Sequence, residues 1–399
     1  MMQGPSSSTN LPRVPVARLA GHDGPVQAIV FTSDGKWCLT GGLDRTVKLW
    51  NPFRVDPQYT AAIAAKSSES LRSKTRGPPP REAMKMTTGT AAFQDLPPAL
   101  NIQTYSGGLT HDISALCVTS PPSLSPSSSQ TLLAACDKTM VVTDLISNQV
   151  KRRLGQHHHT GRINAVAATT QYGGEAYVTA SYDATVAIWD GRSRDTKPLQ
   201  VLKDAKDSVT SVYIQQQTSS GGAHNSSSSV KDYSNNIAII RTASVDGIVR
   251  TYDLRKGLLQ CDDFGSPVTS MARTKDGNCL VVSCLDGTIR LMELETGELL
   301  NTYNSYHTAG QYGLDVDVLA DDATIVTGSE NGACALYDLV RANMVQVLDG
   351  PARRPTCTVA AHPKQSSVVV AASYDNSTVV WSHDNISWQE QLDGDDEVD

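Results

Sequence analysis

The stretch Thr40–Asn51, TGGLDRTVKLWN, decides the fold, because a stretch of the same pattern, TASYDATVAIWD, occupies Thr179–Asp190. Each stretch holds a Thr, an Asp four positions later and a Trp six positions after that Asp. The pattern returns around five further anchor positions: Asp137, Asp246, Asp286, Asn331 and Asp375. Seven copies of one segment indicate a repeat protein and argue against a chain of unrelated domains.

The anchors recur with a period that fits one small sheet per copy. They are 93, 46, 63, 40, 45 and 44 residues apart, and both long gaps contain an irregular segment. Without residues 1–13, 52–100, 216–236 and 384–399, the remaining 300 residues give about 43 per copy. The residues three and five positions after most anchors are apolar, an alternation typical of β-strands. The sequence therefore predicts four strands per copy, seven times over.

These copies resemble the repeats of WD-repeat β-propeller proteins. The likeness rests on Gly21-His22, followed 28 positions after the His by Trp50, which matches the Gly-His to Trp-Asp spacing of that family. It covers nearly the whole chain outside the insertions. The resemblance implies an all-β fold, a seven-bladed WD-repeat β-propeller without catalytic activity.

A propeller must close into a ring, because an open ring leaves an exposed sheet edge. We expect residues 14–383 to form the ring and residues 14–19 to close it as the outer strand of the seventh blade. A flexible N-terminus, 1–13, and an acidic tail, 384–399, would lie outside it. Disordered insertions would crowd one face of the ring, at 52–100, 120–130 and 216–236.

Two repeats hold four polar side chains that the resemblance places in a hydrogen-bonded tetrad. The tetrads are His22, Thr40, Asp44 and Trp50 in the first repeat and His159, Thr179, Asp183 and Trp189 in the third. The Asp would accept from the His ring, and the Thr hydroxyl would bond both the ring and the indole N–H. A His, a Thr and an Asp also resemble a hydrolase triad, but triads do not occur in copies, so we interpret both sets as structural.

Other motifs predict no enzyme, metal or cofactor. The adjacent His157, His158 and His159 point to alternate sides of an extended segment and do not converge on one ion. The sequence contains no phosphate-binding loop and no nucleophile elbow. Repeats four, five and seven show Asp204-Ala205, Asp263-Phe264 and Ala352-Arg353 where a Gly-His would stand, so we expect those blades to rely more on apolar packing.

Composition restricts the classes of partner. A net charge of −7 argues against direct nucleic-acid binding, and apolar runs of at most five residues predict no membrane helix. The first twenty residues lack the apolar region of a secretory signal, and the eight cysteines form no Cys-x-x-Cys. These features predict an intracellular protein, and the family resemblance further implies a cytoplasmic and nuclear location and a monomer within larger complexes.

The uncluttered face of the ring is the predicted partner surface, since loops on a stiff scaffold carry function. It would present aromatic and basic side chains, the types that dominate interfaces. The candidates are Arg162, Tyr182, Lys206, Tyr312, Arg353, Arg354 and Tyr374. On the other face, two Ser-Pro dipeptides within 120–130 and a basic run at 66–85 are candidate phosphorylation and import elements, with solvated loops as the alternative.

Two functional hypotheses follow from the resemblance. Tyr252–Arg255 and Thr296–Leu300 resemble segments of propellers that organise mitogen-activated protein kinase cascades and are associated with the pre-mRNA splicing machinery. The partners would then be kinase-cascade components or spliceosome subunits. As the alternative, Arg192 and Arg255 in Trp-Asp-x-Arg-like endings resemble the residues with which substrate receptors of cullin-type ubiquitin ligases contact their adaptor.

Overall fold

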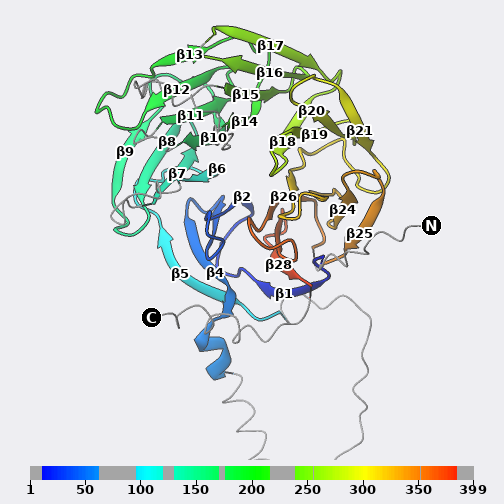
Figure 1. The fold of residues 1–399 in the computed structure, drawn as a ribbon. Coiled ribbons are helices and arrows are strands. Elements are labelled where there is room, and N and C mark those ends of the chain that lie inside the picture. The colour runs from blue at the N-terminus through cyan, green and yellow to red at the C-terminus, as the bar shows by residue number, and fades with distance from the viewer. Residues whose placement is uncertain are drawn as a thin grey trace, which may run out of the picture.

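The computed structural model describes residues 11–62, 96–119, 130–169, 176–215, 239–254, 256–350 and 352–383. These residues form 28 strands in seven four-stranded antiparallel sheets, which surround a central channel as blades (Figure 1). This arrangement confirms the all-β, seven-bladed propeller. The described part of the chain contains no helix with the length and apolar character of a membrane span.

Blades one to three follow one another along the chain, each running from an inner to an outer strand. Blade one contains β2 (Val26–Phe31), β3 (Cys38–Gly42), β4 (Val47–Val55) and β5 (Ala99–Tyr105). Blade two contains β6 (Ile113–Val118), β7 (Thr131–Cys136), β8 (Thr139–Asp144) and β9 (Val150–Leu154). Blade three contains β10 (Ile163–Thr169), β11 (Ala176–Ser181), β12 (Val186–Asp190) and β13 (Gln200–Leu202).

Blades four to six repeat this order. Blade four contains β14 (Val209–Gln215), β15 (Ile239–Ser244), β16 (Ile248–Asp253) and β17 (Leu258–Asp263). Blade five contains β18 (Val268–Arg273), β19 (Cys279–Cys284), β20 (Ile289–Glu293) and β21 (Leu299–Tyr303). Blade six contains β22 (Val316–Val318), β23 (Thr324–Gly328), β24 (Cys334–Asp338) and β25 (Met344–Leu348).

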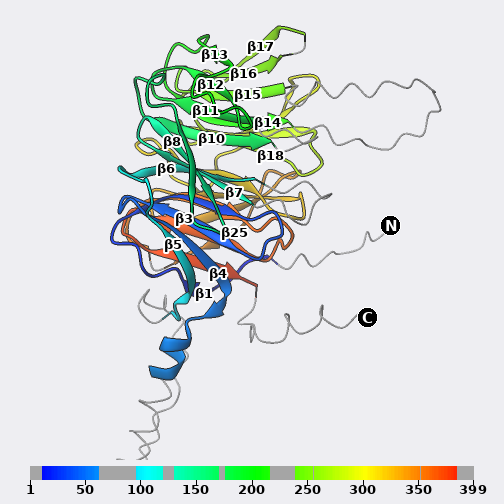
Figure 2. The same ribbon diagram turned by 90° about the vertical axis from the view of Figure 1, so that its left-hand side faces the viewer.

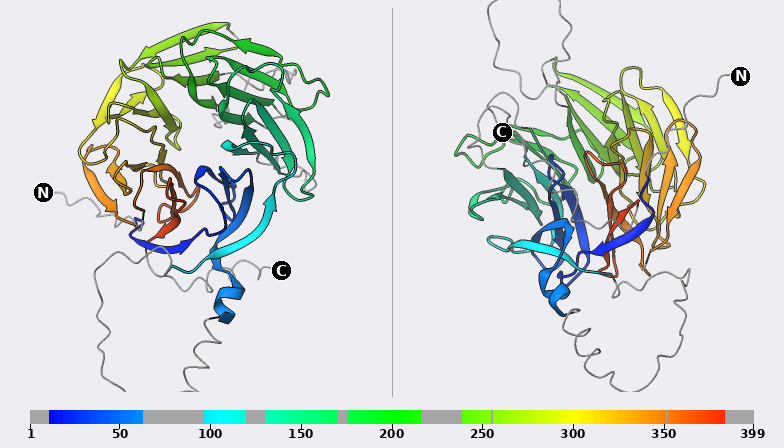
Figure 3. Two further views of the ribbon diagram at one scale, coloured as in Figure 1. Left: turned by 180° about the vertical axis from the view of Figure 1, so that it is seen from behind. Right: turned by 60° about the horizontal axis from the view of Figure 1, so that its bottom comes forward.

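Blade seven joins the two ends of the ring. It contains β26 (Thr356–Ala361), β27 (Val369–Ser373), β28 (Thr378–Ser382) and, outermost, β1 (Val14–Arg18). β1 runs antiparallel to β28, with Val14 opposite Ser382 and Arg18 opposite Val379. Figure 3 shows this blue N-terminal strand beside the red final strand. The predicted closure by the N-terminal strand is confirmed.

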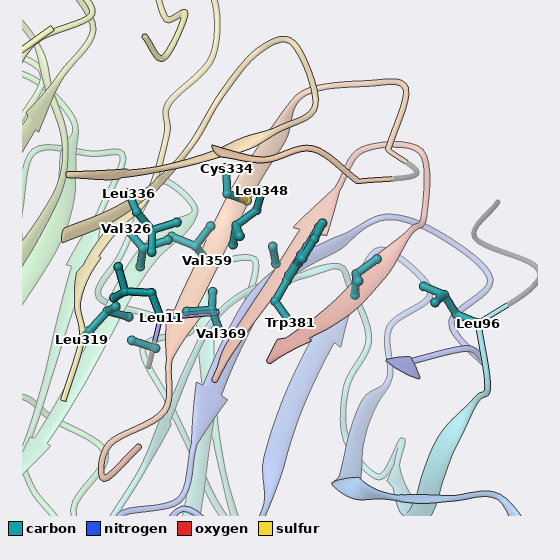
Figure 4. Close-up of a cluster of buried hydrophobic side chains, with 13 residues drawn as sticks. Leu11, Leu96, Leu319, Val326, Cys334, Leu336, Leu348, Val359, Val369 and Trp381 are labelled. Carbon is teal, nitrogen blue, oxygen red and sulfur yellow. The ribbon is translucent and has the colours of Figure 1, made fainter. Parts of the chain in front are cut away.

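The expected boundary at residue 14 is wrong, because the ordered arm begins earlier. Leu11 is buried in the apolar cluster between blades six and seven, and Figure 4 shows it beside Leu319 and Val369. The Arg13 amide donates to the Ser382 carbonyl over 2.7 Å, and the Gln346 side chain donates to the Pro12 carbonyl over 2.8 Å. Residues 11–13 thus latch blade seven to blade six.

The expected insertion at 52–100 is also shorter than predicted. β4 continues to Val55, residues 57–62 form a helical segment that projects from the ring (Figure 2), and β5 starts at Ala99. Pro52 does not end the strand, since β4 departs from regular pairing with β5 between Asn51 and Val55. Residues 63–95, most of the segments 120–130 and 216–236, and the tail 384–399 lie outside the described residues.

The apolar core consists of seven clusters, one between each pair of neighbouring blades. Second strands such as β7 are buried at every position, because a neighbouring blade covers each of their faces. The outer strand β17 is exposed at nearly every position. Each blade is therefore stable only between two neighbours, which makes closure a requirement for the whole ring.

Candidate functional site

The two faces of the ring differ in the segments that build them. The turns between second and third strands, together with the lead-in segments before each first strand, form what we call the aspartate face. The turns between first and second strands and between third and fourth strands form the insertion face. The described strands on either side of 63–95, 120–129 and 216–238 end on the insertion face, so the aspartate face keeps only short turns.

In blade one the four tetrad residues form a continuous hydrogen-bonded chain. His22 Nδ1 lies 2.9 Å from Asp44 Oδ2, His22 Nε2 lies 2.7 Å from Thr40 Oγ1, and Trp50 Nε1 donates to Thr40 Oγ1 over 2.8 Å. Since Asp44 can only accept, Nδ1 carries the proton and Nε2 accepts from the hydroxyl. Burial lowers the pKa of His22 despite the Asp44 charge, which keeps the ring neutral. His22 and Thr40 are both buried, so no substrate reaches them.

Blade three repeats this arrangement with a looser link to its Asp. Thr179 Oγ1 lies 2.7 Å from His159 Nε2 and 2.9 Å from Trp189 Nε1. His159 Nδ1 is closer to Thr185 Oγ1, at 3.1 Å, than to Asp183 Oδ2, at 3.5 Å. Burial opposes ionisation of Asp183, but hydrogen bonds from Thr185 and Thr160 outweigh it and lower the Asp183 pKa to about 2.

Blades four and five, which we expected to rely more on apolar packing, also hold an ion pair that the sequence analysis did not foresee. An Arg four positions after the anchor takes the role of the missing His: Arg250 Nη2 lies 2.7 Å from Asp246 Oδ2, and Arg290 Nη2 lies 2.8 Å from Asp286 Oδ2. Arg250 is almost fully buried, and its Nη1 also donates to Ser244 Oγ over 2.9 Å. In these two blades an Arg–Asp ion pair thus replaces the neutral hydrogen-bonded side chains of blade one. The Gly-His motif gives no sign of this pair.

Blade six contains a further buried His that the repeat pattern missed. His307 Nδ1 lies 2.8 Å from the hydroxyl of Tyr337, which occupies the position of the Trp. The Tyr306-His307 pair, with His where the Gly-His motif places it, was the available signal. The Tyr337 hydroxyl thus hydrogen-bonds the His ring directly, so this contact replaces those that Thr40 and Trp50 make in blade one.

The anchor carboxylates also hold the lead-in segments in place, a role that sequence analysis did not predict. Asp44, Asp183, Asp246 and Asp375 each accept a backbone amide from the segment that leads into their blade, over 2.7 to 3.2 Å. In blade six, Glu330 Oε1 takes this role for two amides at 2.6 and 2.9 Å. The backbone of the aspartate face is thus fixed at the segments that carry the candidate partner residues.

A belt of polar side chains lines the channel where it opens on the aspartate face. In six blades the first strand shifts register after its first residue, a β-bulge that turns the next side chain towards the channel. Several of these side chains donate to a backbone carbonyl of the next blade: Ser114 to Ile163, Asn164 to Val209, Thr210 to Val268 and Thr269 to Leu314. The polar second residue of every first strand except β26, where it is Cys357, was the signal for this belt.

The channel mouth is a cavity of about 360 Å³ that brings three candidates together. Arg162, Tyr182 and Tyr374 all line it, and Arg162 donates to the Gln27 side chain across the mouth from blade three to blade one. The Tyr312 ring packs on that of Tyr374 with centroids 5.5 Å apart. Tyr182 is 68% exposed, whereas Tyr374 is half-buried, which raises its pKa to about 12.

A half-buried carboxyl group, Asp315, also lines this mouth. Burial, and secondarily the charge of Asp317, raises the pKa of Asp315 to about 7, although Ser270 and Thr358 hydrogen-bond it. The mouth therefore presents aromatic rings and one guanidinium around a carboxyl that resists ionisation.

The remaining candidates lie at the lead-in segments around the mouth. Lys206, Arg353 and Arg354 are exposed, and anchor carboxylates fix the amides of Lys206 at 2.9 Å and of Arg353 at 2.7 Å. The Arg354 carbonyl accepts from Ser373 Oγ over 2.8 Å. These cationic side chains thus project from a backbone that is already ordered.

The other motifs fall elsewhere. Arg192 lies at the insertion-face end of β12 with a side chain 68% exposed, and Arg255 lies outside the described residues. The Ser-Pro dipeptides and the run 66–85 also lie outside them. His158 packs edge-on against Trp189 while His159 is buried in its tetrad, and the described residues hold no cluster of three potential metal ligands.

Comparison with known proteins agrees with this architecture. The model of the WD domain, G-beta repeat, matches residues 13–51 and 149–190, and that of the anaphase-promoting complex subunit 4 WD40 domain matches 232–319. A WD repeat domain-containing protein 83 homolog from Dictyostelium discoideum is 25% identical over 91% of this chain and 96% of its own length.

Mammalian relatives share more identity over a shorter stretch. WD repeat domain-containing protein 83 from Rattus norvegicus is 36% identical over 39% of this chain, and the Homo sapiens protein is 34% identical over 39%. The match spans less than half of either protein, 43% and 42%. In its repeats and its fold the chain is therefore similar to WD-repeat β-propeller proteins, including relatives named WD repeat domain-containing protein 83.

Proposed function

We propose that this chain is a non-enzymatic scaffold that binds other proteins through the aspartate face and assembles them into one complex. By its resemblance to propellers that organise mitogen-activated protein kinase cascades, the partners are components of such a cascade. The same resemblance makes subunits of the pre-mRNA splicing machinery a second set of partners, and the protein acts in the cytoplasm and the nucleus.

The supporting observation is the display of exposed aromatic and cationic groups on a backbone that hydrogen bonds already fix. The backbone amides of Arg353 and Lys206 donate to anchor carboxylates, and Tyr182 is exposed at the channel mouth. A partner that binds such a surface loses little entropy in ordering it. Aromatic and Arg side chains are also those that contribute most to protein interfaces.

Affinity purification of the intact chain from its native cells, followed by mass spectrometry, tests the proposal. We expect kinase-cascade or spliceosome subunits to co-purify. Recovery of a cullin and a propeller-shaped adaptor in their place would contradict the scaffold and favour the ubiquitin-ligase alternative. In that case Arg192→Glu, whose side chain is 68% exposed, should remove the adaptor.

A further inference from the structure

Blades seven and one meet at a groove on the insertion face, away from the proposed partner surface. Its volume is about 380 Å³. Three segments line it: the turn 34–37 after β2, residues 51–54 in β4, and the turn 362–365 after β26. Its function therefore has to be sought apart from the aspartate face.

The groove has an aromatic interior. Trp37 and Phe53 are half-buried walls, and the buried His362 lies edge-on to Phe53 with ring centroids 5.6 Å apart. His362 Nδ1 accepts from the amides of Lys364 and Gln365 at 3.1 and 2.9 Å, so its Nε2 carries the proton and donates to the Gly35 carbonyl over 3.0 Å. The imidazole is thus neutral and fixed, and the interior suits an apolar or aromatic side chain.

The rim of the groove is positively charged. Lys36, Arg54 and Lys364 are exposed, and among the described residues none of the three has a carboxylate within 4.0 Å. The acidic rim residue, Asp34, is engaged by its own turn, because it accepts from the Thr32 hydroxyl and from the Lys36 amide. The rim therefore favours a negatively charged occupant.

The chain leaves the described structure at the insertion-face end of blade seven, the end at which this groove lies. Trp381, near the end of β28, pairs with Val369, the first residue of β27 after the turn that carries His362. Residues 384–399 thus start at the same end of blade seven as the groove wall. They contain seven acidic residues and no Lys, Arg or His, with Trp388 only five residues beyond His383. Extended over those residues, the chain reaches about 17 Å.

We propose that the C-terminal segment 384–399 binds in this groove, with the Trp388 side chain between Trp37 and Phe53 and its acidic residues against Lys36, Arg54 and Lys364. The aromatic interior matches the Trp, and the cationic rim matches the surrounding carboxylates. The basic run 66–85, which follows β4 in the sequence, would meet a rim of its own charge.

Fluorescence anisotropy with a labelled peptide of residues 384–399 tests the proposal on the full chain. The variant Trp388→Ala leaves the groove open, so the peptide should bind that chain at least tenfold more tightly than the wild-type chain, whose own tail competes. Adding Lys36→Glu and Lys364→Glu should weaken binding to the Trp388→Ala chain at least tenfold at low salt. Adding Lys197→Glu and Lys203→Glu, two exposed positions on blade three, is the matched control and should change nothing.

Four results would overturn this assignment. The first is that the peptide binds neither chain, and the second is that it binds both with equal affinity. The third is an affinity that the Lys36 and Lys364 variants leave unchanged, which places the binding elsewhere. The fourth is that a peptide of residues 63–95 binds the open groove and the C-terminal peptide does not, which would give the groove to the insertion.

Discussion

At the scale of single residues, the ring is stabilised by buried polar groups that each form hydrogen bonds with two other side chains. Thr40 shows this most clearly, because its hydroxyl bonds both the His22 ring and the Trp50 indole inside blade one. Blades four and five, which lack that set, use Arg250 and Arg290 for the same turn. Losing one member of such a set leaves buried partners unpaired, and this costs more than the bond itself contributes.

Replacing Thr40 by Val keeps the shape of the side chain and removes its hydroxyl. We expect a loss of about 2 kcal/mol in unfolding free energy, because His22 Nε2 and Trp50 Nε1 are both left buried and unpaired. Thr169→Val is the matched control, since the buried Thr169 hydroxyl has no hydrogen-bond partner among the described residues. Thermal melts in which both variants lose the same stability would contradict the tetrad's structural role.

A second prediction concerns the carboxyl of Asp315. Its pKa is raised to about 7 in the folded chain and is near 3.8 when unfolded, so between these values the folded state holds the extra proton. The carboxyl therefore costs stability at pH 8, where it must ionise in place, and that cost shrinks steadily as the pH falls from 7 to 3.8 and is absent only below that. Asp315→Asn should melt above the wild type at pH 8, with a smaller advantage at pH 5.5. A difference that is independent of pH would contradict this.

At the scale of elements, the sequence predicts the strands, but it predicts only some of the contacts that connect them. Alternating apolar residues and turn residues predicted every blade, because each repeat carries the same local pattern. The arm at residues 11–13 and the Arg250–Asp246 pair were missed for a common reason. Both depend on contacts that the repeat pattern does not specify. Leu11 packs on blade six, which is far away in the sequence. Arg250 occupies the position that Lys48 holds in blade one, so the repeat pattern did not mark it as a partner of Asp246.

The early start of the N-terminal arm has a measurable consequence. Leu11→Ala should cost about 2–4 kcal/mol, because it opens a cavity in the cluster between blades six and seven. Deleting residues 1–10 should leave the melting temperature unchanged. Leu199→Ala, at a side chain 68% exposed, is the matched control and should cost little. If Leu11→Ala melts like Leu199→Ala, the arm does not contribute to closure.

At the scale of the whole molecule, seven interdependent blades hold one face rigid and free of insertions. The repeat count predicted the ring and its closure, and the anchor spacing predicted which face stays clear. Spacing did not predict that Arg162 reaches Gln27 across the channel or that Tyr312 packs on Tyr374, because the ring brings together residues from separate blades. Which side chains meet on the aspartate face therefore depends on closure of the ring and cannot be deduced from one repeat.

The central claim is that this aspartate face recruits partner proteins. The measurement is quantitative affinity purification with the variant Tyr182→Ala, Arg353→Glu and Arg354→Glu, all at exposed side chains. Its control on the insertion face is Arg194→Glu, Lys197→Glu and Leu199→Ala, which makes the same number of charge reversals and truncates one equally exposed side chain.

Both variants should melt like the wild type. We expect the aspartate-face variant to recover at least tenfold less of a main partner than the wild type, while the control variant recovers the same amount. The opposite pattern, or full retention by the first variant, would contradict the account.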